Sequence, residues 1–333
     1  MVGMAKTVRF GEYGEPEVLV VEDVPVAEPG PGELLVRIEA IGLNRAEALY
    51  RRGLYIERPN AFPAKLGAEA AGTVESVGPG VTGFEAGQAV SVIPSFSMND
   101  YAVYAERAVV PASAVLDRPE GIDAATGAAV WMPYLTAYGA LVQVGGLKAG
   151  DPVVITAASS SVGLAAIQIA NRLGAKPIAT TRTTAKRDAL LEAGAAAVVV
   201  TEDEPLAERV LELTGGKGAR HAFDAVAGSA VANLVRATAP GGTVFLYGVL
   251  SGEATPFPNF ALGMPAVALR TFLVHETTRS PERLREAEAF IVSGLRSGAF
   301  TPRIDRAFAF DDIAAAHAYL ERGGQIGKII ATV

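Results

Sequence analysis

The second half of the chain alternates between short apolar runs and amphipathic helical patterns. The apolar runs, rich in valine and alanine, lie at residues 152–158, 176–182, 195–200, 219–226, 242–248 and 269–275. Helical patterns stand between most of them, at 162–174, 184–194, 205–215 and 229–240. Near-continuous apolar strands separated by amphipathic helices are typical of a parallel sheet covered on both faces. Six such strands predict a full doubly wound α/β domain.

The first 130 residues follow another pattern. Short valine-rich runs are separated by turn signals such as PGPGE and GPGVTG, and one helix is expected over 44–53. An irregular β-barrel or sandwich is the natural interpretation. The tail beyond residue 275 cannot easily extend a six-stranded sheet, so we expect it to return to this β-rich domain. The predicted domains are therefore 1–130 with 276–333, and 131–275, with a ligand cleft between them.

Composition narrows the function classes. The formal net charge of −7 argues against nucleic acid and anionic membranes as main partners, and no apolar run reaches the length of a membrane helix. The opening residues lack the apolar block of a signal peptide, so we expect a cytoplasmic protein. The chain has no cysteine, which excludes disulfides, thiolate nucleophiles and cysteine-ligated zinc. Its three histidines do not lie at metal-ligand spacing, and we predict no metal site.

The turn after the first apolar run, in TAASSSVG, has the small residues that a pyrophosphate site needs. On the G-x-G-x-x-G template its positions are Ala158, Ser160 and Gly163, of which only the last is glycine. A tight strand-to-helix connection without a ligand is an equally good interpretation of this turn alone. Serine hydroxyls can still donate to a phosphate. The candidate pyrophosphate contacts are Ser159, Ser160, Ser161, Val162 and Gly163.

The end of the second apolar run indicates which dinucleotide would bind. NAD sites place an acidic residue about 20 positions after the turn, but this stretch reads ATTRTTAKR and contains no acid. Thr181 ends the strand, and Arg182 and Lys186 follow it. Two cations at a helix start are favoured when an anion is present. The alternative is that both are ordinary solvated charges. The pattern favours NADPH, with its 2′-phosphate, over NADH.

Several motifs in a fixed order resemble the medium-chain dehydrogenase/reductases, and most of all their zinc-independent quinone oxidoreductase branch. They are GLNRAEALYRRGLY, LGAEAAGTVESVGPGV, AASSSVGLAAIQIA, GGTVFLYG and HAYLERGGQIGKII. The resemblance covers nearly the whole chain. It implies a GroES-like β-rich catalytic domain, a Rossmann NADPH-binding domain, and a homodimer or homotetramer.

The departures from the zinc-bearing branch of that family bear on the chemistry. Asn44 stands where a cysteine ligand is expected, Ala68 stands where the histidine of GHExxG is expected, and only Glu69 of that pair remains. The resemblance therefore implies a chain that does not carry the family's zinc. Without a Lewis acid, hydride transfer works best with an electron-poor acceptor. We predict NADPH-dependent reduction of a quinone or an α,β-unsaturated carbonyl.

The resemblance also supplies candidate site residues. Asn44 and Tyr55 are the candidate catalytic residues. The resemblance places Asn44 beside the nicotinamide, where it would bind the substrate oxygen or the cofactor ribose. It places Tyr55 in the substrate pocket. Capping of a helix and plain packing are their structural alternatives. The further cofactor contacts it implies are Thr136, Tyr247, Gly248, Val249, Phe272, Leu273, Val274 and Lys328. The alternative for the apolar members is that they are simply residues of a buried strand. The alternative for Lys328 is an ordinary surface lysine.

Two other functions fit the same sequence. One is an enoyl-thioester reductase on the same scaffold, and the other is a protein that binds NADPH without significant turnover. The second stays open because no indispensable catalytic side chain is evident, and fold alone does not establish chemistry.

Overall fold

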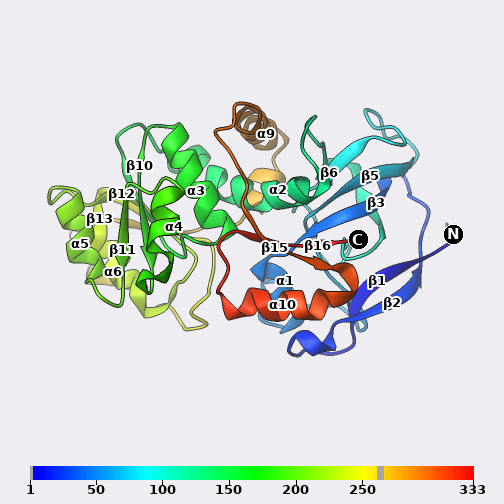
Figure 1. The fold of residues 1–333 in the computed structure, drawn as a ribbon, viewed down its shortest axis with the longest axis horizontal. Helices are drawn as coiled ribbons and strands as arrows, with labels where there is room; N and C mark the ends of the chain where they lie inside the picture. The colour runs from blue at the N-terminus through cyan, green and yellow to red at the C-terminus, as the bar shows by residue number, and fades with distance from the viewer. Residues whose placement is uncertain (1–2, 261–265) are drawn as a thin grey trace. The chain divides into compact units, whose positions relative to one another are not determined.

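The computed structural model describes residues 3–260 and 266–333, which form two compact units. One unit comprises Met1–Met132 and Pro302–Val333, and the other comprises Pro133–Thr301. Helix α2 (Ala124–Tyr138) carries the chain from the first to the second. The β-rich arrangement of the first unit and the strand–helix alternation of the second follow the predicted fold class (Figure 1).

The first unit contains two sheets. The smaller sheet has the order β2-β1-β4, and the larger has the order β15-β16-β3-β5-β6-β8, with β7 also pairing with β3. Apart from the parallel pair β15 and β16, the described pairings in this unit are antiparallel. Its strands are β1 (Met4–Phe10), β2 (Val20–Pro25), β3 (Glu33–Gly42), β4 (Ala64–Lys65), β5 (Ala70–Val77), β6 (Ala89–Val92), β7 (Arg107–Pro111), β8 (Val115–Asp117), β15 (Ile304–Ala309) and β16 (Lys328–Thr332).

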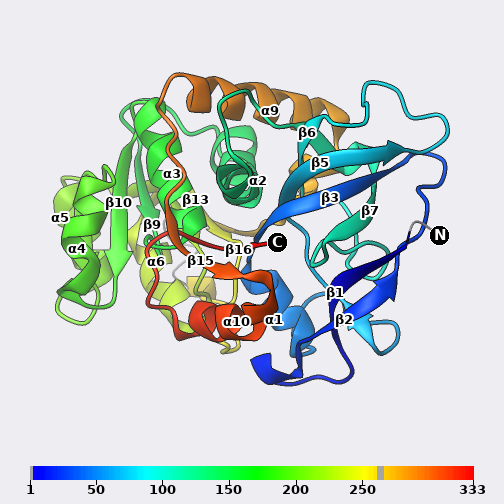
Figure 2. The ribbon, with the colours of Figure 1, turned by 45° about the vertical axis from the view of Figure 1, so that its right-hand side comes forward.

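Two helices of this unit lie against each other, α1 (Arg45–Arg51) and α10 (Ile313–Arg322) (Figure 2). An ion pair between the buried Arg51 and the partly buried Glu321 joins them. The last strand β16 pairs antiparallel with the end of β3, with Ile330 opposite Gly42. The chain's final residues therefore lie beside the segment that leads into α1.

The second unit is built on a six-stranded parallel sheet with the order β11-β10-β9-β12-β13-β14. The strands are β9 (Pro152–Ile155), β10 (Lys176–Thr181), β11 (Ala197–Val200), β12 (Ala219–Asp224), β13 (Thr238–Leu246) and β14 (Ala268–Thr271). The order reverses between β9 and β12, which is the switch point of a doubly wound sheet. All six expected strands form. The residues of β9, β10, β11 and β12 are mostly buried, as in a sheet covered on both faces, whereas the edge strand β14 is exposed or only partly buried.

Helices cover this sheet as the sequence periodicity predicts. α3 (Ser161–Arg172) packs on β9 and β10, and α4 (Arg187–Glu192) packs on β11. α5 (Leu206–Leu213) and α6 (Val231–Ala237) pack together, and their buried side chains join those of the sheet in one core. α8 (His275–Thr278) and α9 (Pro281–Arg296) follow the last strand.

The structure differs from the predicted boundary at residue 275. Helix α9 belongs to the unit of the parallel sheet, and the chain returns to the β-rich unit only at Pro302. The physical reason is aromatic and apolar packing: the Phe290 ring lies 4.7 Å from that of Tyr138 and 5.6 Å from that of Phe300, and Ile291 is fully buried. A helix can cover the flank of a sheet without adding a strand to it, which the expectation from the sequence overlooked.

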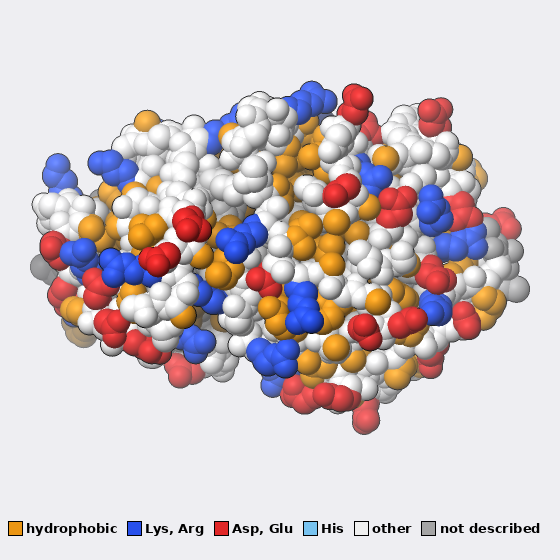
Figure 3. Space-filling view, viewed as in Figure 1, with side chains coloured by type: hydrophobic (Ala, Val, Ile, Leu, Met, Phe, Trp, Pro, Cys, Tyr) orange, Lys and Arg blue, Asp and Glu red, His pale blue; other side chains and the backbone are white. Residues whose placement is uncertain are grey.

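Charged side chains of both signs are interspersed on the face drawn in Figure 3. No helix of the described residues is long and apolar enough to cross a membrane.

Candidate functional site

The carboxyl ends of the parallel strands gather most of the candidate cofactor residues at one edge of the sheet. β9 ends just before the serine turn, β10 ends at Thr181, β12 ends at Asp224, and β13 ends just before Tyr247. Phe272 follows β14 directly, and its N–H donates to the Leu246 carbonyl at 2.8 Å. Because ligands of open α/β sheets bind at this edge, the topology brings these segments together where the sequence predicts a site.

The serine turn after β9 is shaped by helix capping. Ser160 is the N-cap of α3, and its hydroxyl oxygen accepts a hydrogen bond from the Gly163 N–H at 3.1 Å. This bond uses the Gly163 N–H, which is one of the free N–H groups at the start of α3. The N–H groups of Ser161 and Val162 are still available to an anion. Ser159, Ser160, Ser161 and Val162 are partly buried.

Gly163 is the position of the template where a side chain has no room. A Cβ there would lie 2.6–2.7 Å from the backbone of Ala158. Such contacts are far inside van der Waals distance, so the helix can approach the strand this closely only with glycine. The third glycine of the motif therefore keeps its packing role. Ala157 in the same turn has φ of 45°, a left-handed backbone conformation that costs energy in any residue except glycine.

The basic residues after β10 lie at the same edge. The Lys186 amine donates to the Ser159 hydroxyl at 3.1 Å, which links the second strand's end to the serine turn. Arg182 is exposed. Thr181, Arg182 and Lys186 thus follow one another at the carboxyl end of β10, and no acidic side chain stands among residues 176–187.

Asp224 connects the end of β12 to the end of β9 through hydrogen bonds. Its carboxylate accepts from the Thr156 hydroxyl at 2.5 Å and from the backbone N–H of Val226 and Ala227 at 3.1 and 2.7 Å. The Thr156 oxygen in turn accepts from the Ala225 N–H at 3.0 Å. Asp224 is therefore a structural carboxylate, and Thr156 is its side-chain partner on the neighbouring strand end.

The segments after β13 and β14 differ in exposure. The Tyr247 ring stacks on Phe223 with ring centroids 4.0 Å apart, and burial, with the Asp224 charge, raises the Tyr247 pKa, so the phenol keeps its proton. A Cβ on Gly248 would meet the Ala225 carbonyl oxygen at 2.7 Å. Val249 and Leu273 are exposed, Val274 is partly buried, and Phe272 is buried. Thr136 is buried in α2.

The candidate catalytic residues belong to the other unit. Asn44 is the N-cap of α1, and its N–H donates to the Glu47 carboxylate at 3.0 Å. Its side chain turns inward, with the Oδ1 atom 2.5 Å from the Lys328 amine. The same amine lies 2.5 Å from Glu69 Oε2. Asn44 thus caps helix α1 and also belongs to a polar cluster. Lys328 is buried, so the alternative of a surface lysine is wrong.

Glu47 is the member of this cluster that sequence reasoning missed, although its position three residues after Asn44 matches a capping box. Burial raises its pKa to about 7, against the opposing effects of its hydrogen bonds and of Lys328. Tyr55 lies outside the cluster, partly buried between the exposed side chains of Leu54 and Ile56.

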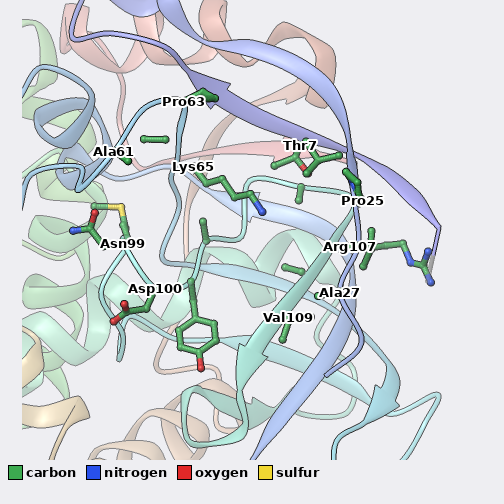
Figure 4. A pocket seen from close by; sticks show the side chains of 18 of the residues that line it. Thr7, Pro25, Ala27, Ala61, Pro63, Lys65, Asn99, Asp100, Arg107 and Val109 are labelled. Carbon is green, nitrogen blue, oxygen red and sulfur yellow. The ribbon is translucent and has the colours of Figure 1, made fainter. Parts of the chain in front are cut away.

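A separate cavity of about 540 Å³ opens in the same unit (Figure 4). Its lining includes Thr7, Pro25, Lys65, Asn99, Asp100 and Arg107, and none of the candidate residues lines it. Among the described residues, no group of three histidine, cysteine or acidic side chains could hold a metal ion.

Comparisons with known proteins agree with this division. Residues 30–120 match the alcohol dehydrogenase GroES-like domain, and residues 161–293 match the family model described as zinc-binding dehydrogenase. A β-rich GroES-like domain joined to a doubly wound sheet with a ligand edge defines a medium-chain dehydrogenase/reductase.

Relatives within that superfamily define the branch. The quinone oxidoreductase of Pseudomonas aeruginosa is 34% identical over 98% of this chain and 99% of its own length. The quinone oxidoreductase structure from Pseudomonas syringae superposes with a TM-score of 0.93 at 31% identity, over 99% of this chain and all of that one. The structure of Escherichia coli quinone oxidoreductase complexed with NADPH superposes with a TM-score of 0.92 at 30% identity. The match covers 98% of this chain and 100% of that one. The chain belongs to the zinc-independent quinone oxidoreductase branch and is an oxidoreductase.

Proposed function

We propose that this protein uses NADPH to reduce quinones or α,β-unsaturated carbonyls. The observation that carries the cofactor assignment is the edge of the parallel sheet, where Arg182 and Lys186 follow β10 and no carboxylate takes the place expected for NAD. The Escherichia coli relative binds NADPH, which agrees with it. When bound, NADPH supplies the hydride.

The residues of the second unit bind and orient this cofactor. The N–H groups at the start of α3 and the serine hydroxyls hold the pyrophosphate, since a helix N-terminus favours an anion. Arg182 and Lys186 hold the 2′-phosphate through charge-assisted hydrogen bonds, with Thr181 beside them. Thr136 and the segments 247–249 and 272–274 line the nicotinamide. Close approach is possible because Gly163 and Gly248 carry no side chain.

The first unit supplies the polar groups for the reaction, with Asn44 and Tyr55 as the proposed contacts. The Lys328 amine binds the side-chain oxygens of both Asn44 and Glu69. The negative charge of Glu69 is therefore neutralised by Lys328 and is not available to another group. Acceptors that delocalise negative charge onto a conjugated oxygen need little further help beyond positioning. This favours a quinone or an enone over a simple aldehyde.

The partner that we propose for assembly is a second copy of the chain. Strand β14 is an edge strand of the parallel sheet, and Phe257 and Phe260 close by in sequence are 71% and 86% exposed. An edge strand with exposed apolar neighbours is a template for pairing. Homodimer and homotetramer are both compatible with it, and light scattering coupled to size exclusion distinguishes them from a monomer. The expected cytoplasmic location stays a prediction.

The decisive experiment follows absorbance at the reduced-nicotinamide band, with a chelator present. NADPH and NADH are each tested with a quinone, an enone, an enoyl thioester and a simple aldehyde. NADPH-dependent loss of absorbance with quinone or enone, and not with the aldehyde, is the expected result. Turnover of the thioester alone would favour the enoyl-thioester reductase, and tight NADPH binding without turnover would favour the binding protein. A preference for NADH would contradict the roles given to Arg182 and Lys186.

A further inference from the structure

The cavity of about 540 Å³ in the first unit has no part in the proposed function, since none of the proposed cofactor or substrate contacts lines it. Its walls come mainly from β1, β2 and β7 and from the segments 60–65 and 98–102 (Figure 4). We call it the Lys65 cavity, after the lysine of β4 that lines it. Its volume lies within the range of about 300–1,000 Å³ that small-molecule sites occupy.

Most of the side chains that line the Lys65 cavity are apolar. They include Pro25, Pro63, Met98, Ala108 and Val109. Met98 and Ala108 are buried within the protein, so this part of the wall is a fixed apolar surface. Apolar surface removed from water contributes about 25 cal/mol per Å². The wall therefore favours a ligand with an apolar body.

Lys65 brings a positive charge to this apolar wall. Its side chain extends into the cavity, toward the middle of the view in Figure 4. In the part of the chain that the structure describes, its amine forms no ion pair with a carboxylate. Partial burial and the charge of Arg9 lower the pKa of Lys65, because both disfavour the ammonium form. An anion in the cavity would have the opposite effect.

The neighbouring strand places a second cation beside Lys65. β1 and β4 pair antiparallel, with Arg9 directly opposite Lys65. Residues directly opposite each other share one face of the sheet, and like charges there are destabilising. Arg9 has Glu22 as its partner at 3.0 Å, and Arg107, the other cation that lines the cavity, pairs with Glu75. Lys65 is thus the lining cation whose charge is left for a ligand.

The acidic side chains of the cavity do not compensate this charge. The Glu33 carboxylate accepts a hydrogen bond from the Tyr101 hydroxyl at 2.7 Å, so it is already engaged. Asp100 is exposed, and its carboxylate points away from Lys65 in Figure 4. The charges that face the middle of the cavity therefore select an anion.

We propose that the Lys65 cavity binds an organic monocarboxylate, with its carboxylate on the Lys65 amine and its apolar body against the wall that Met98 and Val109 help to form. One ammonium matches one carboxylate, and the apolar wall supplies the remaining affinity. This site is independent of the proposed function, because no residue that we assign to NADPH or to its acceptor takes part in it.

Titration calorimetry with three probes tests the two parts of the site. Benzoate carries both the charge and an apolar body, benzamide lacks the charge, and acetate lacks the body. We expect benzoate to bind with a dissociation constant of about 1 mM, and the other two at least about fivefold more weakly. Hydrogen exchange of the peptide amides of residues 58–66 should slow when benzoate binds.

Variants then assign the binding to Lys65. Lys65→Met should weaken benzoate binding about fivefold without lowering the melting temperature, because it also removes a like-charge pair. Lys65→Glu should weaken it further, and Lys65→Arg should retain it. The matched control is Lys176→Met, which removes another exposed lysine at the start of a strand in the second unit and should leave benzoate binding unchanged.

The remaining outcomes overturn the proposal. They are no benzoate binding at about 20 mM, equal affinity for benzoate and benzamide, and equal affinity of Lys65→Met and the original protein. Loss of benzoate binding in an Arg182→Ala/Lys186→Ala variant would place the anion in the second unit and would also contradict it. Failure of the original protein to bind NADPH would overturn the proposed function and leave this inference standing.

Discussion

Replacement of Gly163 by alanine tests whether the serine turn is built for close approach of helix and strand. The new Cβ would lie 2.6 Å from Ala158 Cα and carbonyl oxygen, so the start of α3 must move by about 0.8 Å to reach ordinary contact. Overpacking of this kind costs about 1–3 kcal/mol. Alanine regains about 1 kcal/mol through its helix propensity. The net loss is therefore about 0–2 kcal/mol, with a midpoint of about 1 kcal/mol.

Two measurements follow from this magnitude. Calorimetry should show a melting temperature about 3 °C lower for a unit of this size. NADPH should bind about tenfold more weakly, because the displaced N–H groups lose charge-assisted hydrogen bonds worth about 1.5–3 kcal/mol each. The matched control is Gly324→Ala, since a Cβ there meets open space and the backbone is not left-handed. A Gly163→Ala variant with unchanged melting temperature and NADPH affinity would refute the argument.

Three further predictions can be checked in the same way. Ala157→Gly should raise stability by about 0.5 kcal/mol, because relief of the left-handed conformation exceeds the entropy cost of glycine; a lower melting temperature would contradict it. Arg182→Ala and Lys186→Ala should each raise the KM for NADPH about tenfold and leave that for NADH nearly unchanged, and equal effects on both would exclude a 2′-phosphate contact. Burial lowers the pKa of His317 from 6.5 to about 3, so the folded state resists protonation and its stability falls as the pH drops from about 6.5 toward 3. Denaturant unfolding at several pH values should show a weaker acid dependence in His317→Gln, and an unchanged dependence would place its cause in other groups.

The sequence alone determined the layer architecture and the sheet edge at which the carboxyl ends of the strands meet. Periodicity decides both, because strands buried on two faces are apolar throughout and their helices are amphipathic. It also placed the serine turn, Thr181, Arg182, Lys186 and Tyr247 at strand ends, since the carboxyl ends of parallel strands share one edge. The boundary at residue 275 was wrong because a local pattern identifies helix α9 without stating what the helix packs against.

Contacts between residues distant in the chain were decided only by the tertiary structure. Asn44 and Lys328 are 284 positions apart, and pairing of β16 with β3 brings them together. Whether a lysine near the end of a chain lies at the surface or inside a cluster depends on that pairing, which no local pattern encodes. The same is true of Thr156 and Asp224, which meet because β9 and β12 are neighbours in the sheet. Local propensity selects the elements, whereas the partners of buried polar groups are set by burial and by the need to satisfy every charge removed from water.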